Sequence, residues 1–140
     1  MTRGFTLVEI MIVIGLILIV ISATLPLGGN WYRLNNFDSV YNLTLSSLRK
    51  AQAYAIDKKN NTVWGVCLTG STIRLFAGTC ASPTIKNDYS LPSDITVSGL
   101  STVTFSNLRG EPSAPQTITI DSGDKTKTIT INLLGGIDIN

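Results

Sequence analysis

Apolar residues are distributed unevenly along the sequence and are concentrated in a stretch near its start, from Phe5 to Leu25. Glu9 is the only charged residue in this stretch, and a run of about 20 apolar residues matches the thickness of the hydrocarbon core of a bilayer. The pattern therefore predicts a helix that spans a membrane once. A carboxylate in such a helix is costly unless it is paired or lies near the interface, so Glu9 is a candidate functional residue.

The apolar stretch is followed by Pro26 and by the glycine pair Gly28–Gly29. Proline removes an intrahelical hydrogen bond, and glycine costs about 1 kcal/mol relative to alanine inside a helix. We expect a kink or a locally melted turn at Pro26 within one long helix. The alternative is that these residues end the membrane segment.

Residues from Asn30 to about Asp57 have the periodicity of an amphipathic helix. Apolar side chains recur at intervals of three and four residues, and most polar side chains, Ser47 among them, fall off this stripe. We expect the stripe to pack on a sheet, and the pair Asn60–Asn61 to close the helix. The predicted stripe consists of Leu34, Phe37, Tyr41, Leu45, Leu48, Ala51 and Ala55.

Beyond Thr62 the pattern changes to the alternation of apolar and polar residues that is typical of strands. Residues 63–68 and 72–76 predict a hairpin that turns at Gly70–Ser71, and the glycine and prolines of residues 78–93 indicate an irregular loop. The fold class is therefore α+β, with a long N-terminal helix packed on a small antiparallel β-sheet head. Further strands are predicted at residues 95–97, 103–106, 116–120, 126–132 and 137–139.

Charge and composition remove several common kinds of chemistry. The net charge is +2, and the Lys and Arg residues are scattered rather than gathered in the basic stripe of a nucleic-acid-binding domain. The chain has no histidine, which is the commonest general base and metal ligand. We interpret Asp121, Asp124 and Asp138 as solvated turn residues rather than calcium ligands. The sequence therefore predicts no catalytic set, no metal site and no cofactor.

The two cysteines, Cys67 and Cys80, both lie in the β-rich part of the chain. One pair in an exported domain suggests a disulfide, whereas the same pair in the cytosol would stay reduced. In a hairpin that turns at Gly70–Ser71, Cys67 lies opposite a residue near Arg74, so a bridge requires the chain after Gly78 to fold back onto the first strand. The alternative is two separate buried thiols, each acting as a small apolar side chain.

Three interpretations of the N-terminal segment compete. A secretory signal peptide would be cut after a small residue such as Thr24, but the apolar run is longer than a usual signal core. A plain membrane anchor leaves Glu9 unexplained. The third interpretation explains both features: residues 1–9 read MTRGFTLVE, which resembles the prepilin signature of a short basic leader ending in glycine, then FTLxE and an apolar helix.

The prepilin resemblance implies a processing and assembly site. It implies cleavage between Gly4 and Phe5 by a prepilin peptidase and methylation of the new amino group on Phe5. Glu9 would then pair with the amino terminus of a neighbouring subunit in a filament, because burying two opposite charges together offsets much of the cost of burying one. Pro26 falls where many pilins carry a proline, which favours the kink.

The same resemblance implies the organisation, the location and the partners of the chain. Residues 1–4 form a leader, residues 5–29 a transmembrane and assembly helix, and residues 30–140 an amphipathic helix with a β-rich pilin head. Arg3 fits the positive-inside rule, which places the amino terminus in the cytoplasm and the head outside the inner membrane. The implied partners are the prepilin peptidase, other pilin or pseudopilin subunits, and an inner-membrane assembly platform.

The head is similar to the H-type minor pseudopilins and related minor pilins of the general secretion pathway H and FimT-like family. The similarity lies in an alanine-rich helix end before Trp64–Val66 and in the strand 103–105, which precedes Gly110 and Pro112. It implies a long helix against two small antiparallel sheets. The implied function is that of a structural, minor subunit of a type IV pilus or a type II secretion pseudopilus.

The alternative function is a binding module: a pilin-like tip protein, an adhesin or a DNA-uptake component. DNA-binding minor pilins carry a basic carboxy-terminal tail, and residues 137–140 are not basic. Nucleic acid is therefore the less favoured partner, without being excluded.

Overall fold

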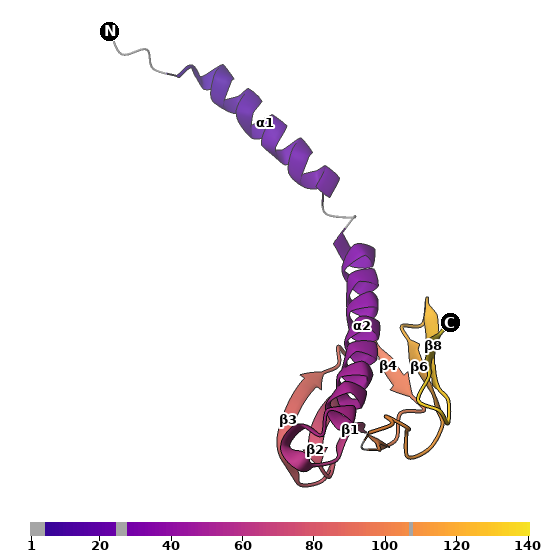
Figure 1. Cartoon of the computed structure of the whole chain (residues 1–140). Helices are drawn as coiled ribbons and strands as arrows, with labels where there is room; N and C mark the ends of the chain where they lie inside the picture. The colour runs from indigo at the N-terminus through magenta and orange to yellow at the C-terminus, as the bar shows by residue number, and fades with distance from the viewer. Residues whose placement is uncertain (1–4, 25–27, 107) are drawn as a thin grey trace. The chain divides into compact units, whose positions relative to one another are not determined.

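The computed structural model describes residues 5–24, 28–106 and 108–140, which form helices and short strands (Figure 1). The chain divides into two compact units, Met1–Leu34 and Asn35–Asn140. The order of elements is α1 (Leu7–Thr24), α2 (Gly28–Ile56), a 3-10 turn (Lys59–Asn61), β1 (Trp64–Thr69), β2 (Thr72–Gly78), β3 (Pro83–Ser90), β4 (Thr96–Ser98), β5 (Val103–Phe105), β6 (Gln116–Asp121), β7 (Thr126–Ile131) and β8 (Ile137–Ile139).

The apolar N-terminal stretch forms α1, and its large apolar side chains are exposed, from 46% at Ile10 to 76% at Leu7. Of the segment predicted as a helix over residues 5–29, the structure describes α1 from Leu7 to Thr24 and the start of α2 at Gly28, while residues 25–27 lie outside the described residues. Pro26 lies outside the described residues, so the kink there stays a prediction. Within the part of the chain that the structure describes, no helix combines the length and the hydropathy that crossing a membrane requires.

The first sheet of the head has the strand order β3-β2-β1-β5, and its neighbouring strands are antiparallel. The predicted hairpin is confirmed, since β1 and β2 pair from Trp64 opposite Ala77 to Thr69 opposite Thr72. Gly70 in the turn has a φ of +58°, a left-handed conformation that glycine adopts without a steric penalty.

The prediction of an irregular loop over residues 78–93 is wrong for half of its length, because Pro83–Ser90 form β3. β3 pairs with β2 and lies at the edge of the sheet, where most of its residues are exposed. Proline is tolerated as the first residue of an edge strand, because its missing N–H is not needed by the ladder. β3 is exposed over most of both faces, and the polar run Lys86–Asp88 interrupts the alternation by which a half-buried strand is predicted.

The second sheet has the strand order β4-β6-β7-β8. Thr and Ile alternate along β6 and β7, and Ile118 pairs opposite Ile129. One face of this hairpin is therefore a row of isoleucines, which is the reason for the alternation in the sequence. The hairpin predicted from that alternation is confirmed. The isoleucines with 0% exposure are Ile118, Ile120, Ile129 and Ile131.

The buried face of α2 is the part of the core that both sheets share. A single cluster of buried side chains joins residues of α2 with residues of each sheet, and Figure 1 shows the helix between the strands of the two sheets. The predicted stripe is confirmed at Phe37, Leu48, Ala51 and Ala55, each with 0% exposure. Leu34 is 50% exposed, because it precedes the first residue of the head unit.

Two polar residues of α2, Thr44 and Ser47, lie on the buried face, although the periodicity placed Ser47 off it. Thr44 Oγ1 donates a hydrogen bond to the carbonyl oxygen of Val40 at 2.8 Å, one turn earlier in the same helix. A small hydroxyl that bonds its own backbone can be buried at little cost. Periodicity of apolar residues alone misses such positions.

Cys67 and Cys80 form a disulfide, with 6.3 Å between their Cα atoms. Cys67 lies opposite Arg74 in the hairpin, as predicted, so the bridge depends on a return of the chain after β2. Gly78 makes that return with a φ of +96°, and Arg74 Nη1 donates to the carbonyl oxygen of Cys80 at 3.1 Å. The head therefore contains the bridge rather than two separate thiols.

Replacing both cysteines, as Cys67→Ala with Cys80→Ala, should lower the free energy of unfolding by about 3 kcal/mol. The reason is that the bridge closes a loop between residues 13 apart in sequence, which restricts the unfolded chain. Urea unfolding of the full-length protein measures the loss. Reduction of the unsubstituted protein should give a similar loss, which separates the cross-link from the size of the side chains. Two labelled thiols in denatured, unreduced protein would contradict the bridge.

Candidate functional site

The amino-terminal end of α1 carries the residues of the predicted assembly site. Thr6 precedes the first helical residue, and its Oγ1 accepts a hydrogen bond from the N–H of Glu9 at 3.3 Å. The Thr6 carbonyl oxygen accepts from the N–H groups of Glu9 at 3.1 Å and Ile10 at 3.3 Å. This is one half of a capping box, with Thr6 as N-cap and Glu9 as the third helical residue. Glu9 also lies where the helix dipole favours a negative charge.

This local role of Thr6 and Glu9 was missed by the sequence reasoning, although the T-x-x-E spacing is its signal. Phe5 is 79% exposed, and Glu9 is also exposed. Gly4 lies outside the described residues, so the bond between Gly4 and Phe5 stays a predicted cleavage site. The structure therefore presents Phe5 and Glu9 at one accessible helix end, followed by a helix with exposed apolar side chains.

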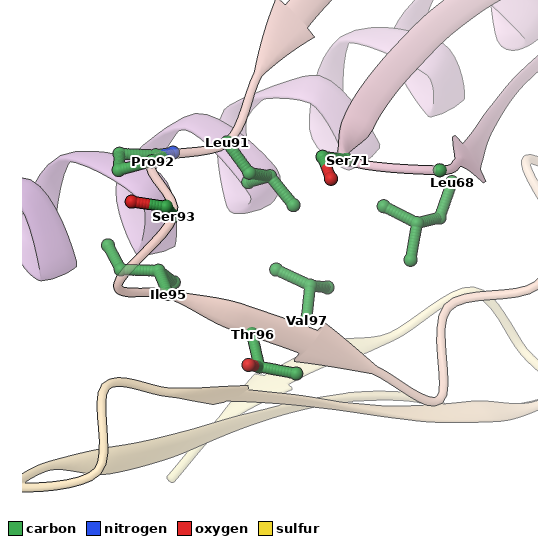
Figure 2. A pocket seen from close by; sticks show the side chains of 9 residues that line it. Leu68, Ser71, Leu91, Pro92, Ser93, Ile95, Thr96 and Val97 are labelled. Atoms are coloured by element: carbon green, nitrogen blue, oxygen red, sulfur yellow. The ribbon is translucent and has the colours of Figure 1, made fainter.

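A hollow of about 260 Å³ lies in the head, between the turn that joins β1 to β2 and the segment that leads from β3 into β4 (Figure 2). The N–H of Leu91 donates to the carbonyl oxygen of Ser71 at 2.8 Å, which ties that segment to the turn. The residues that line the hollow carry no charged group. Its aliphatic side chains come from Leu68, Leu91, Ile95 and Val97.

The described residues offer no obvious metal centre. Across residues 5–24, 28–106 and 108–140, no group of three or more His, Cys, Asp or Glu side chains is placed to hold a metal ion.

Comparison with known families identifies two parts of the chain. Residues 42–135 match the family of the type II transport protein GspH, and residues 1–25 match the prokaryotic N-terminal methylation motif. The first match covers more than half of the chain. The chain belongs to the GspH family. Among curated proteins, none matches the chain significantly.

The fold of this GspH-family chain is similar to that of the minor pseudopilin EpsH from the type 2 secretion system of Vibrio cholerae. The similarity has a TM-score of 0.52 and covers 74% of this chain and 92% of that chain, with 15% sequence identity. At this identity the likeness concerns the fold. The predicted H-type resemblance and the α+β pilin-like architecture are confirmed.

A charged pair that the sequence reasoning did not find ties the edge strand of the GspH-family head to its neighbour. Arg74 Nε donates to Asp88 Oδ1 at 2.7 Å, and Arg74 Nη2 donates to Asp88 Oδ2 at 3.1 Å. The hydrogen bonds from Arg74 lower the pKa of the Asp88 carboxyl below its ordinary value. Because Arg74 also bonds the carbonyl of Cys80, one guanidinium connects β2, β3 and the disulfide turn.

A second charged cluster ties the β6–β7 hairpin to α2. Lys125 Nζ and Lys127 Nζ donate to Asp38 Oδ1 at 3.2 Å and 3.3 Å. Lys125 Nζ also lies 5.1 Å from the ring centroid of Phe37, and Lys127 Nζ lies 4.4 Å from that of Tyr41. Hydrogen bonds from Lys125, and then from Lys127, lower the pKa of Asp38 below its ordinary value. The partners are 87 and 89 residues apart in sequence, which no local pattern reveals.

Asp38→Asn should destabilise the head at neutral pH by about 0.5 kcal/mol, because partly exposed ion pairs contribute little each. The folded-state pKa of Asp38 is lowered, so its contribution is present above the unfolded-state pKa and disappears as the pH falls through the folded-state value. The difference in free energy of unfolding between the two proteins should therefore be largest near pH 7 and vanish in strong acid.

Thermal unfolding of both proteins across this pH range measures the difference. Asp57→Asn, at an exposed carboxylate just after α2, is the matched control and should cause a smaller change at neutral pH. A difference between Asp38→Asn and the unsubstituted protein that grows on acidification would contradict the assignment.

Proposed function

We propose that the chain is a structural, minor subunit of a type II secretion pseudopilus or a type IV pilus, cut and methylated at its amino terminus and assembled through α1. The observation that carries the proposal is the order of two matches in one chain: the N-terminal methylation motif over residues 1–25, then the GspH domain over residues 42–135. A processing motif joined to a head whose described hollow has no charged lining residue suits a building block rather than an enzyme.

Processing is the first step of the proposal. A prepilin peptidase cuts between Gly4 and Phe5, and the new amino group of Phe5 is methylated. Two features support this: the methylation motif includes both residues, and Phe5 is 79% exposed just before the first turn of α1. An exposed segment that precedes a helix can enter the active site of a peptidase in an extended form.

Assembly and location are the second step. The apolar side chains of α1 are exposed, and a helix with apolar residues around its circumference requires lipid or other helices as its surroundings. We place residues 5–29 in the inner membrane before assembly, with the amino terminus in the cytoplasm and the head outside. The Cys67–Cys80 bridge supports an oxidising compartment for the head. The partners would be the peptidase, other pilin-like subunits and the inner-membrane assembly platform.

The alternative of a tip, adhesin or DNA-uptake module has weaker support from the head surface. Lys125 and Lys127 could have formed a basic patch, but both bond Asp38. Trp64, which could have marked an aromatic binding patch, is 2% exposed and donates its indole N–H to the carbonyl of Lys59 at 2.8 Å. Neither feature favours nucleic acid over a protein neighbour.

Mass spectrometry of the protein from its native membrane should give a chain that begins at Phe5 with one methyl group on its amino terminus. Gly4→Val should leave the chain uncut, because the peptidase of this family requires a small residue before the cut. A chain that still begins at Met1, or that is cut after Thr24, would contradict the prepilin assignment. Leu7→Val, in the same segment after the cut, is the matched control and should be processed normally.

Glu9→Ala should reduce incorporation of the processed chain into filaments by about tenfold or more, because a buried amino terminus on the neighbour loses its partner. Glu9→Gln isolates the effect of the charge, since it keeps the length and polarity of the side chain but not its charge. Incorporation is measured in sheared filaments by immunoblotting, with Met11→Ala as the control on the same helix. Normal incorporation of Glu9→Gln would reject charge pairing.

A further inference from the structure

The Cys67–Cys80 bridge lies on the face of the first sheet that points away from α2. Side chains alternate between the two faces of a strand, and Val66 and Leu75, on the inner face, belong to the core cluster around α2. Cys67 and Phe76 occupy the positions next to them and point to the other face, yet they are only 1% and 0% exposed. The first sheet therefore has a small buried region on its outer face.

The turn between β2 and β3, residues 79–82, is held over this outer face. Because the Cys67 side chain points to the outer face, the sulfur of Cys80 that is bonded to it lies there as well. Arg74 Nη1 donates to the Cys80 carbonyl oxygen at 3.1 Å, and Thr69 Oγ1 lies 3.6 Å from the Cys80 Sγ. Among the described residues, the hydrogen bonds that tie this turn to β1 and β2 pass through Cys80.

The strand β3, which follows this turn at the margin of the first sheet (Figure 1), adds nothing to the buried core. None of its eight residues is buried, and Ile85 is 41% exposed. The strand is held by its ladder with β2, by a bond from Thr84 Oγ1 to the Ala77 carbonyl oxygen, and by the Arg74–Asp88 pair. Segments with few buried apolar contacts and exposed backbone hydrogen bonds open at low free energy. β3 is therefore a segment that can open while the core stays folded.

The bridge is placed where this weakly held strand begins. Cys80 lies shortly before Pro83, the first residue of β3, and the register of the ladder shifts between Ala77 and Gly78, just before the turn. Cross-linking Cys80 to β1 restricts the chain that follows it. Pairing of β3 with β2 then costs less conformational entropy than it does for a free segment.

We propose that the Cys67–Cys80 bridge is a redox-dependent latch on the edge of the first sheet. With the bridge formed, residues 79–90 stay on β1 and β2. With the two thiols reduced, these residues detach while the core around α2 and the second sheet stay folded. The second sheet shares no strand with the first and reaches the core through its own side chains, such as Ile118 and Ile129, so the release of β3 leaves its packing intact.

Closing the latch is a two-electron oxidation. Each thiol loses one hydrogen as the S–S bond forms, and the two electrons and two protons pass to an acceptor disulfide, which becomes two thiols. A thiol–disulfide exchange protein in the compartment of the head is the class of reactant that supplies this acceptor. In the closed form Cys80 is partly exposed and Cys67 is 1% exposed, so a reducing thiolate attacks the Cys80 sulfur and Cys67 leaves as the thiol.

The latch couples the oxidation of the head to the completion of its first sheet. In the oxidised head β3 covers the edge of β2, whereas in the reduced head β2 becomes an edge strand with unpaired backbone groups, which are prone to pair with another chain. This role goes beyond the proposed function, which uses the bridge only as a sign of an oxidising compartment.

Hydrogen–deuterium exchange of the full-length protein in dodecyl maltoside tests the latch at neutral pH. After reduction with dithiothreitol, peptides that cover residues 79–90 should exchange at least about tenfold faster, while peptides from α2, β6 and β7 should change less than about twofold. Cys67→Ala with Cys80→Ala is the matched control. Its residues 83–90 should exchange as fast as those of the reduced protein, with and without dithiothreitol.

Unchanged exchange of residues 83–90 in protein whose two thiols are both labelled by iodoacetamide would overturn the proposal. Faster exchange of every segment alike would also overturn it, since the head would then unfold as a single unit. Arg74→Met removes the charged pair with Asp88 and keeps the bridge, and its oxidised form should keep most of the protection of β3. Exchange as fast as in the reduced protein would assign the latch to the guanidinium and reject the role of the bridge.

Discussion

The packing of one helix face against two separate sheets is the constraint on which the head depends. The buried side of α2 supplies both large and very small side chains, Phe37 and Leu48 beside Ala51 and Ala55, all with 0% exposure. The two sheets are hydrogen-bonded within themselves, and the apolar cluster around α2 joins them.

Polar contacts from α2 complete this arrangement. Asp38 holds the β6–β7 hairpin through two lysines. Gln52, further along the same helix, donates to the carbonyl oxygens of Gly110 and Gly135 in two turns of the head. Each contact joins the helix to a segment of the head by directional hydrogen bonds, which apolar packing does not provide. The helix therefore determines the position of the sheets through its apolar face and the position of the turns through its polar edge.

Patterns that repeat along the chain predicted most of the secondary structure, because they depend on neighbouring residues. Contacts between residues far apart in sequence were not predicted, because no local pattern records them. The threonine–isoleucine alternation of β6 and β7 follows from one buried face, so the sequence alone is enough to predict the hairpin. The local sequence is not enough to predict β3, because β3 is held by its hydrogen bonds to β2 rather than by a buried row of its own apolar side chains. The Gln52 contacts likewise join residues 58 and 83 positions apart, and nothing near Gln52 in the sequence signals them.

The N-terminal site, in contrast, could be predicted almost entirely from residues that are neighbours in the sequence. The order of glycine, phenylalanine, threonine and glutamate within residues 4–9 predicted the motif, and the family comparison bears it out over residues 1–25. The cap of Glu9 by Thr6 is local as well. What a single chain does not contain is the neighbour whose amino terminus Glu9 would meet, so that role stays a prediction.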